Sequence, residues 1–198
     1  MASPFDAKHN AIRSKIISYA NKYGIDNNIA IWQIWTESRY NPKACSHANA
    51  CGIAQFIPDT AKRFGVNRND IDSSLDGYGK YMSVLLKRFN NRYDLALAGY
   101  NSGEYRNEYT NATKQNRPIN WKVLPKGVQT ETQNDVNTIL NSAKKNGSTL
   151  VSNNNVVADT ATANNLVKKV ISDIKSDSSL KYATYGIGFI LLLAVLRR

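Results

Sequence analysis

The strongest candidate for chemistry in this sequence is Glu37, a carboxyl group at the end of an apolar run. Residues 29–35 contain three isoleucines and two tryptophans. Apolar walls disfavour a carboxylate anion, and so does the negative end of a helix, so both raise the pKa of such a group. A raised pKa suits a general acid that gives up a proton near neutral pH. An exposed glutamate at a helix end is the alternative interpretation.

A second cluster with chemical potential is formed by Cys45, His47 and Cys51, which fall within seven residues. Three such side chains can begin a zinc site, but no fourth ligand is suitably spaced. A disulfide between the two cysteines, which are the only ones in the chain, is the favoured interpretation. Free thiols and a metal site remain as alternatives. We predict no metal and no cofactor.

The run that ends at Glu37 has the pattern of a buried helix. Ile31, Ile34, Trp35 and Ser38 share one face at helical spacing. Residues 26–28 offer N-cap candidates. The residue before a proline resists the right-handed helical conformation, and Asn41 precedes Pro42, so the helix should end near residues 39–41. Glu37 would then lie in its last turn.

Further helices are expected around this one, and no segment shows a convincing strand pattern. The fold class is therefore mainly α. Gly24 suits the position just after the first of these helices, and Pro58 suits the start of the second. Residues 101–127 are polar and read as loops. The expected helices span residues 7–23, 53–64, 75–90, 93–100 and 129–144.

Short motifs follow Glu37 in a fixed order. Glu37-Ser38 is followed by Ser46, by Gly52-x-x-Gln55, by residues 98–103 (AGYNSG) and by Glu131-Thr132. The series resembles the soluble (SLT-type) lytic transglycosylases, relatives of goose-type lysozyme. Their pattern is E-S, a loop serine, G-x-x-Q, A-Y-N-x-G and E-T-x-x-Y. The resemblance covers roughly residues 10–142 and implies a lysozyme-like α domain.

The resemblance implies cleavage of a peptidoglycan strand with one catalytic carboxyl group. Glu37 would protonate the oxygen that leaves the bond between N-acetylmuramic acid and N-acetylglucosamine. As a carboxylate it would then take the proton of the muramic C6 hydroxyl, which closes a 1,6-anhydro ring. Ordinary glycosidases need a second carboxylate, for which Asp94, Glu104, Glu108 and Glu131 are poor candidates because none has a comparable apolar setting.

The resemblance also supplies residues for substrate binding. Ser46 would form a hydrogen bond near the N-acetyl group, and Gln55 would line the glycan groove. Gly52 would allow a close approach to the backbone, because it has no side chain. Tyr100 and Asn101 would lie at the groove wall, or would simply brace the helix of Glu37. Residues that could tune the acid are Ser38, Glu131 and Asp135.

Four positions depart from the family pattern. Ala54 replaces a methionine that would contact sugar, and Gly99 replaces the alanine of A-Y-N-x-G. Asn49 replaces a glycine, although asparagine tolerates a left-handed turn. Asp135 stands where a tyrosine is expected close to the catalytic acid, and its charge would raise the pKa of Glu37 further.

The net charge is +11, and most of it belongs to the first 150 residues. A basic surface suits nucleic acid, anionic lipid or an acidic polymer. No cluster of lysine and arginine tracks a phosphate backbone, so nucleic acid is not expected as a partner. Peptidoglycan carries carboxylates on its peptide stems, which makes it the expected partner, and a basic surface without a dedicated partner is the alternative.

The C-terminal quarter differs from the rest in composition. We expect a lysozyme-like domain at 1–145, a polar linker with a short amphipathic helix (164–176) at 146–181, and a transmembrane anchor at 182–196. The last run has fifteen uncharged residues, about 22 Å as a helix, which is short against a hydrocarbon core of about 30 Å. Flanking Lys181 and the interfacial tyrosines Tyr182 and Tyr185 favour an anchor. A buried terminal helix is the alternative, and the topology is open.

The N-terminus has no apolar segment typical of a signal peptide. Carriage in the membrane of a bacteriophage particle would bring such an enzyme to the cell envelope. The expected function is a lytic transglycosylase that opens the wall locally during phage infection or release. Lipid and other virion membrane proteins are expected partners. The alternatives are a hydrolytic muramidase and a catalytically silent wall-binding or structural virion protein.

Overall fold

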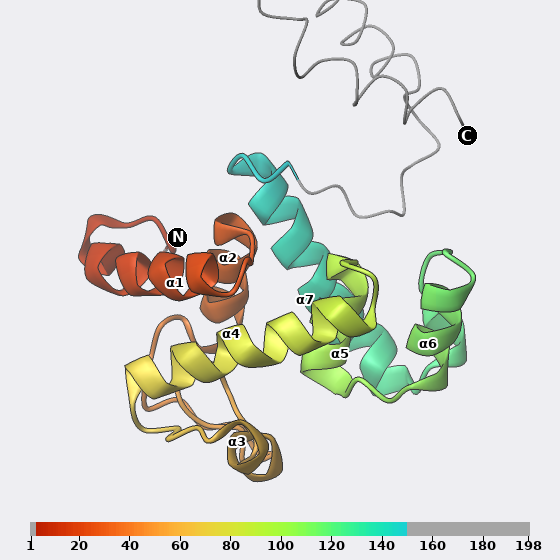
Figure 1. Ribbon diagram of the computed structural model, residues 1–198, viewed down its shortest axis with the longest axis horizontal. Coiled ribbons are helices and arrows are strands. Elements are labelled where there is room, and N and C mark those ends of the chain that lie inside the picture. The colour runs from red at the N-terminus through yellow and green to blue at the C-terminus, as the bar shows by residue number, and fades with distance from the viewer. Residues whose placement is uncertain (1–2, 150–198) are drawn as a thin grey trace, which may run out of the picture. The chain divides into compact units, whose positions relative to one another are not determined.

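The computed structural model describes residues 3–149, which form a helical domain (Figure 1). No strand occurs in this range, where the only β pairing is two isolated bridges that join Cys51 to Cys45 and to Phe56. The mainly α prediction is confirmed for these residues. The α-helices are α1 (Asn10–Lys22), α2 (Asn27–Ser38), α3 (Pro58–Phe64), α4 (Ile71–Arg88), α5 (Tyr93–Ser102), α6 (Asn107–Lys114) and α7 (Lys126–Lys145). Two 3-10 turns, η1 and η2, span Ala7–His9 and Trp121–Val123.

Helix α2 is the buried centre of the domain, packed against α1 and α7. The carboxylate of Asp26 caps it by accepting a hydrogen bond from the Ile29 amide at 2.8 Å. The predicted inner face is correct, because Ile31, Ile34, Trp35 and Ser38 are all buried. The helix ends at Ser38, one residue before the predicted limit.

The end of α2 has a different cause from the one predicted. Arg39 and Tyr40 both adopt left-handed backbone angles, with φ of 53° and 65°. Two such residues in succession turn the chain out of the helix before Asn41 and Pro42 are reached. The Arg39 amide still bonds to the Trp35 carbonyl at 2.9 Å, so Glu37 lies in a closed last turn.

Helix α4 runs across the middle of the domain (Figure 1) and packs against α1, α3 and α5. It begins four residues earlier than predicted, because Asp70 caps it through the Ser73 amide at 2.6 Å. Helix α7 likewise begins at Lys126 rather than at residue 129. The predicted inward side chains of α4 and the segment after it are buried: Tyr78, Tyr81, Met82, Leu85, Leu86 and Phe89.

Residues 101–127, which the sequence predicts to be polar and loop-rich, contain more helix than this prediction named. They contain α6 and η2. Helix α6 is short and polar, and its inner face consists of little more than Tyr109 and Ala112. Glu108 on this helix pairs with Arg117 and accepts the Asn120 amide at 2.6 Å. These tertiary contacts stabilise a helix whose apolar pattern is too sparse to read.

The single helix predicted over residues 7–23 is two elements in the structure, η1 and α1. Gly24, with φ of 66°, follows α1 as predicted. At the other end, Asn146 and Ser148 continue to contact α2: the Asn28 side chain donates to the Asn146 carbonyl at 2.8 Å, and the Ser148 hydroxyl donates to Asp26 at 3.1 Å. The described part of the chain therefore packs beyond residue 145.

Within residues 3–149, no helix has the length and apolar character needed to cross a bilayer. The predicted amphipathic helix at 164–176 and the predicted anchor at 182–196 lie outside the described residues, as does most of the predicted linker.

Candidate active site

The surroundings of the Glu37 carboxyl group favour its protonated form. Burial, then the negative charge of Asp135, then that of Glu131 raise the pKa of this carboxyl group to about 8. The residue keeps partial solvent exposure, so a ligand can reach it. Among residues 3–149, no side chain or backbone amide forms a hydrogen bond or ion pair with its carboxyl group. An accessible carboxyl group that is still protonated at neutral pH can act as a general acid.

Helix α7 brings two further carboxylates towards Glu37. Glu131 is exposed, and Asp135 is half-buried. Burial, followed by the charge of Glu131, raises the pKa of Asp135, while the charge of Arg39 opposes the rise. The predicted influence of Asp135 on Glu37 is therefore present in the structure, and it comes from the helix that packs against α2.

Helix α5 contributes Tyr100 and Asn101. The Tyr100 hydroxyl donates to the Ala54 carbonyl at 2.7 Å, which braces the loop after α2. Burial, and then the charge of Glu37, raises the pKa of Tyr100 well above its ordinary value, so the hydroxyl stays a donor. Exposed Asn101 donates to Asp135 at 3.1 Å and accepts from the hydroxyl of buried Thr132 at 2.5 Å.

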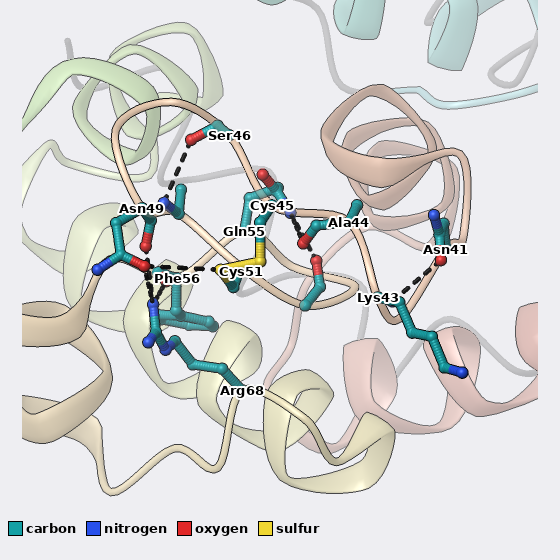
Figure 2. The surroundings of a disulfide bond; sticks show 12 residues. Asn41, Lys43, Ala44, Cys45, Ser46, Asn49, Cys51, Gln55, Phe56 and Arg68 are labelled. Atoms are coloured by element: carbon teal, nitrogen blue, oxygen red, sulfur yellow. Dashed lines mark hydrogen bonds between the residues drawn. A yellow bond between two sulfur atoms is a disulfide. The ribbon is translucent and has the colours of Figure 1, made fainter.

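The loop between α2 and α3 is held by side chains that belong to the sequence motifs. The Gln55 amide donates to the carbonyls of Ala44 and Gly52 at 2.9 and 2.8 Å. The Ser46 hydroxyl accepts from the Ala50 amide at 3.2 Å (Figure 2). The Ser38 hydroxyl donates to the Ile53 carbonyl at 2.7 Å. Ser38 therefore joins the end of the Glu37 helix to the loop and has no direct bond to Glu37.

A disulfide joins Cys45 to Cys51 across this loop (Figure 2). Sulfurs that are bonded to each other are not thiolates, so in this state the cluster with His47 cannot supply the ligands of a zinc site. No group of three histidine, cysteine or acidic side chains suited to a metal occurs among residues 3–149.

Arg68 clamps the same loop from the segment before α4. Its guanidinium donates to the carbonyls of Asn49 and Phe56 at 2.7 and 3.3 Å (Figure 2). Asn49 has φ of 58°, so the asparagine does support the left-handed turn. A Cβ on Gly52 would lie 2.1 Å from the Arg68 carbonyl oxygen. The loop therefore fits only a glycine at this close approach.

The other carboxyl groups considered as partners for Glu37 have structural roles. Asp94 forms a buried ion pair with Arg92 at 2.6 Å. Glu104 is bound by Tyr81 and Arg63, whose hydrogen bonds outweigh burial and lower its pKa. The hydrogen bond from Arg117 likewise outweighs burial and lowers the pKa of Glu108. Each of the three has an arginine partner, which Glu37 lacks among residues 3–149.

Sequence reasoning missed the residues that connect the site. Nothing in the pattern identified Arg68 as a loop clamp or Arg39 as a cation near Asp135. Thr132 belongs to the Glu131-Thr132 motif, but its bond to Asn101 depends on how α5 and α7 pack. One departure also gains an explanation, since a Cβ on Gly99 would lie 2.9 Å from the Phe89 ring. Ala54 is fully buried, and nothing in the structure explains its difference from methionine.

The comparison with known families identifies this arrangement. The Transglycosylase SLT domain family matches residues 14–122, a range that includes Glu37, the clamped loop and the α5 motif. The chain belongs to this family. The matched range stops before α7, so Glu131, Thr132 and Asp135 lie beyond it.

Curated relatives of this SLT domain are lytic murein transglycosylases. Membrane-bound lytic murein transglycosylase C of Histophilus somni (strain 2336) is 42% identical over 65 residues, 30% of this chain and 18% of the relative. Membrane-bound lytic murein transglycosylase D of Escherichia coli (strain K12) is 39% identical over 77 residues, 35% of this chain and 17% of the relative. The chain spans less than a fifth of either protein's length.

Solved structures show the same fold. An inactive mutant of lytic transglycosylase Slt from Pseudomonas aeruginosa superposes with a TM-score of 0.50 and 22% identity, over 67% of this chain and 23% of that one. The 70 kDa soluble lytic transglycosylase of Escherichia coli gives 0.51 and 20% identity, over 66% and 23%. The lysozyme-like helical fold expected from the sequence is thus found here.

Proposed function

We propose that this protein is a peptidoglycan lytic transglycosylase, which cleaves the bond between N-acetylmuramic acid and N-acetylglucosamine and leaves a 1,6-anhydro end. One observation carries the proposal: within an SLT domain, Glu37 is an accessible carboxyl group with a pKa of about 8. The curated relatives named as lytic murein transglycosylases support the same assignment.

The proposed reaction uses Glu37 twice. Its proton goes to the glycosidic oxygen as the bond from the muramic C1 breaks, and the electron pair stays on that oxygen. The resulting carboxylate then accepts the proton of the C6 hydroxyl while the hydroxyl oxygen bonds to C1. The substrate's N-acetyl group helps to stabilise the intermediate. Glu37 ends protonated, ready for another cycle.

The groove that binds the glycan is proposed to run along the clamped loop and the end of α5. Ser46 and Gln55 would present loop polar atoms to the N-acetyl group and the sugar, and Gly52 would allow close backbone approach. Tyr100 and Asn101 would form the opposite wall. Their bonds to Ala54 and Asp135 support a rigid wall.

Hydrolysis by a muramidase mechanism is the second candidate function. The observation that favours it is a second carboxyl group, Asp135, whose charge acts on Glu37. A carboxylate opposite the acid can activate water in an inverting glycosidase. Mass analysis of the muropeptides released from purified wall separates the two. Anhydro ends support the transglycosylase and hydrated ends the muramidase, whereas no release by folded protein would indicate a silent wall-binding or structural protein.

The cellular setting is a separate proposal. We propose that residues 182–196 anchor the enzyme in a membrane as a single-pass protein. The proposed carrier is a bacteriophage particle, which would bring the enzyme to the host envelope. Other virion membrane proteins would then be its neighbours. Support comes only from the apolar composition of this run. Full-length protein should stay with lipid vesicles in high salt, because burial of apolar surface is not screened. Release by salt would contradict the anchor.

A further inference from the structure

Asp135 is a half-buried acidic side chain that the proposed reaction leaves without a role. It projects from α7, which packs against both α2 and α5. The family motif has a tyrosine at this place, so a negative charge here does not belong to the pattern, although Asn101 and Thr132, which support it, are motif residues. What the structure adds is a set of contacts that fix this charge beside the acid.

Two hydrogen bonds in series position the Asp135 carboxylate. The hydroxyl of Thr132, buried one turn earlier on α7, donates to the side-chain amide oxygen Oδ1 of Asn101 at 2.5 Å. That bond fixes the orientation of the Asn101 amide, whose NH₂ group then points to Asp135 at 3.1 Å. An amide donor favours the charged form of a carboxyl group. Asn101 therefore serves Asp135 as an orienting donor.

The charged neighbours distinguish the two carboxyl groups. Asp135 faces Glu131 on its own helix and the Arg39 guanidinium after α2. Glu37 faces Asp135 and Glu131, while the nearby Tyr78 and Tyr100 hydroxyls are neutral. Because Asp135 has a donor and a cation and Glu37 has neither among the described residues, Asp135 loses its proton first. The pair at neutral pH is a protonated Glu37 beside an anionic Asp135.

We propose that Asp135 is a second catalytic carboxylate, whose anion, oriented by Asn101, stabilises the positive charge that develops on the muramic C1 and ring oxygen. This inference rests on the proposed function. Glu37 still gives its proton to the departing oxygen and later takes the C6 hydroxyl proton, so no further reactant is needed. Asp135 forms no bond and moves no proton.

The physical reason is charge complementarity between a fixed carboxylate and the transition state. Glycoside cleavage passes through an oxocarbenium-like transition state. A fixed anion that faces it stabilises the transition state more than the neutral substrate, so the rate rises while binding hardly changes. The same anion raises the pKa of Glu37, which keeps the acid protonated while its partner is charged.

The test compares steady-state wall cleavage by the wild type and Asp135→Asn, each in the full-length chain. Loss of the anion should lower kcat about 10²-fold, the effect typical of one preorganised electrostatic group, with KM changed less than about threefold. The alkaline limb of kcat/KM, set by Glu37, should move to lower pH. Asp135→Glu should recover part of kcat, and Asn101→Ala should lower it about tenfold.

Glu131→Gln is the matched control, because it removes another α7 anion that acts on Glu37 but lacks the Asn101 contact. It should shift the alkaline limb in the same direction but lower the maximal rate clearly less than Asp135→Asn does. Equal loss of maximal rate in both variants would overturn the proposal, since the effect would then be on the Glu37 proton alone. Wild-type kcat in Asp135→Asn or in Asp135→Tyr would also overturn it.

Two further readouts keep the inference separate from the proposed function. Unchanged melting temperatures show that a loss of kcat does not come from unfolding. The product mass reports on the reaction type, because hydrated ends in the wild type would contradict the transglycosylase. If Asp135→Asn then removed only the hydrated ends, Asp135 would be a base for water and our assignment would be wrong.

Discussion

At the residue scale, Glu37 differs from the other buried carboxyl groups of residues 3–149 in what surrounds it. Asp94, Glu104 and Glu108 each pair with an arginine, whereas burial and two negative charges act on Glu37. A paired carboxylate is held as an anion, and an unpaired one near other anions keeps its proton. The same residue type thus serves structure at three positions, and at Glu37 its surroundings suit the acid chemistry that we propose.

Much of this residue-scale picture was predictable from the sequence. The apolar run and the helix end pointed to Glu37, because hydrophobic spacing reports burial directly. The partners of Ser38 and Tyr100 were not predictable, since both donate to backbone carbonyls of a loop. The position of a loop carbonyl depends on tertiary packing, which no side-chain pattern encodes.

Glu37→Gln tests the acid itself. The amide keeps shape and polarity but can neither give nor take the proton, so turnover should fall by at least the ~10²–10⁴-fold that proton transfer contributes. Binding to purified wall should persist, because the groove is unchanged. Co-sedimentation with wall and dye-release assays measure the two properties on one preparation. Substantial cleavage by this variant would send the search to Glu131.

At the element scale, the segment from the end of α2 to the start of α3 carries most of the proposed substrate contacts on irregular backbone. The disulfide, the Gln55 amide and the Arg68 guanidinium each close part of it (Figure 2). The sequence indicated the two cysteines and Gln55 by type and spacing. It could not indicate Arg68, because a long cation that bonds to distant carbonyls leaves no local signature.

The disulfide should set the stiffness of this loop. The Cys45→Ser, Cys51→Ser double variant should lose roughly 2 kcal/mol of unfolding free energy, because the bridge restricts the unfolded chain, and amide exchange across residues 45–51 should speed up. Reductant should reproduce the change in the wild type and leave the double variant unaffected. Two thiols that alkylate freely in native protein from an oxidising compartment would disprove the pairing.

The contact between α5 and the end of α4 explains why Gly99 departs from the family alanine. A Cβ there would lie 2.9 Å from the ring of buried Phe89. Overpacking costs about 1–3 kcal/mol, against a helix-propensity gain of about 1 kcal/mol, so Gly99→Ala should lower the unfolding free energy by about 1 kcal/mol. Phe89→Leu in the same chain should remove most of that effect in a double-mutant cycle. Additive costs would show that the ring is not the obstacle.

At the scale of the whole molecule, the domain boundary expected at residue 145 separates residues that contact each other. Composition changes at that point, where lysines give way to asparagine, glycine and serine, and composition was the only guide the sequence offered. The structure shows that Asn146 and Ser148 return to the start of α2. The side chain of Asp26 thus caps α2 through the Ile29 amide and accepts the Ser148 hydroxyl.

A chain that ends after Thr149 should therefore be more stable than one that ends after Lys145. Truncation at Lys145 removes the bonds from Asn28 to Asn146 and from Ser148 to Asp26, each worth about 0.5–1.5 kcal/mol, so the difference in unfolding free energy should be about 1–3 kcal/mol by urea titration. Ser148→Ala in the longer chain is the matched control and should reproduce part of the loss. Because α2 carries Glu37, the shorter chain should also lose activity at a lower temperature. Equal stability of the two chains would place the domain boundary at Lys145 after all.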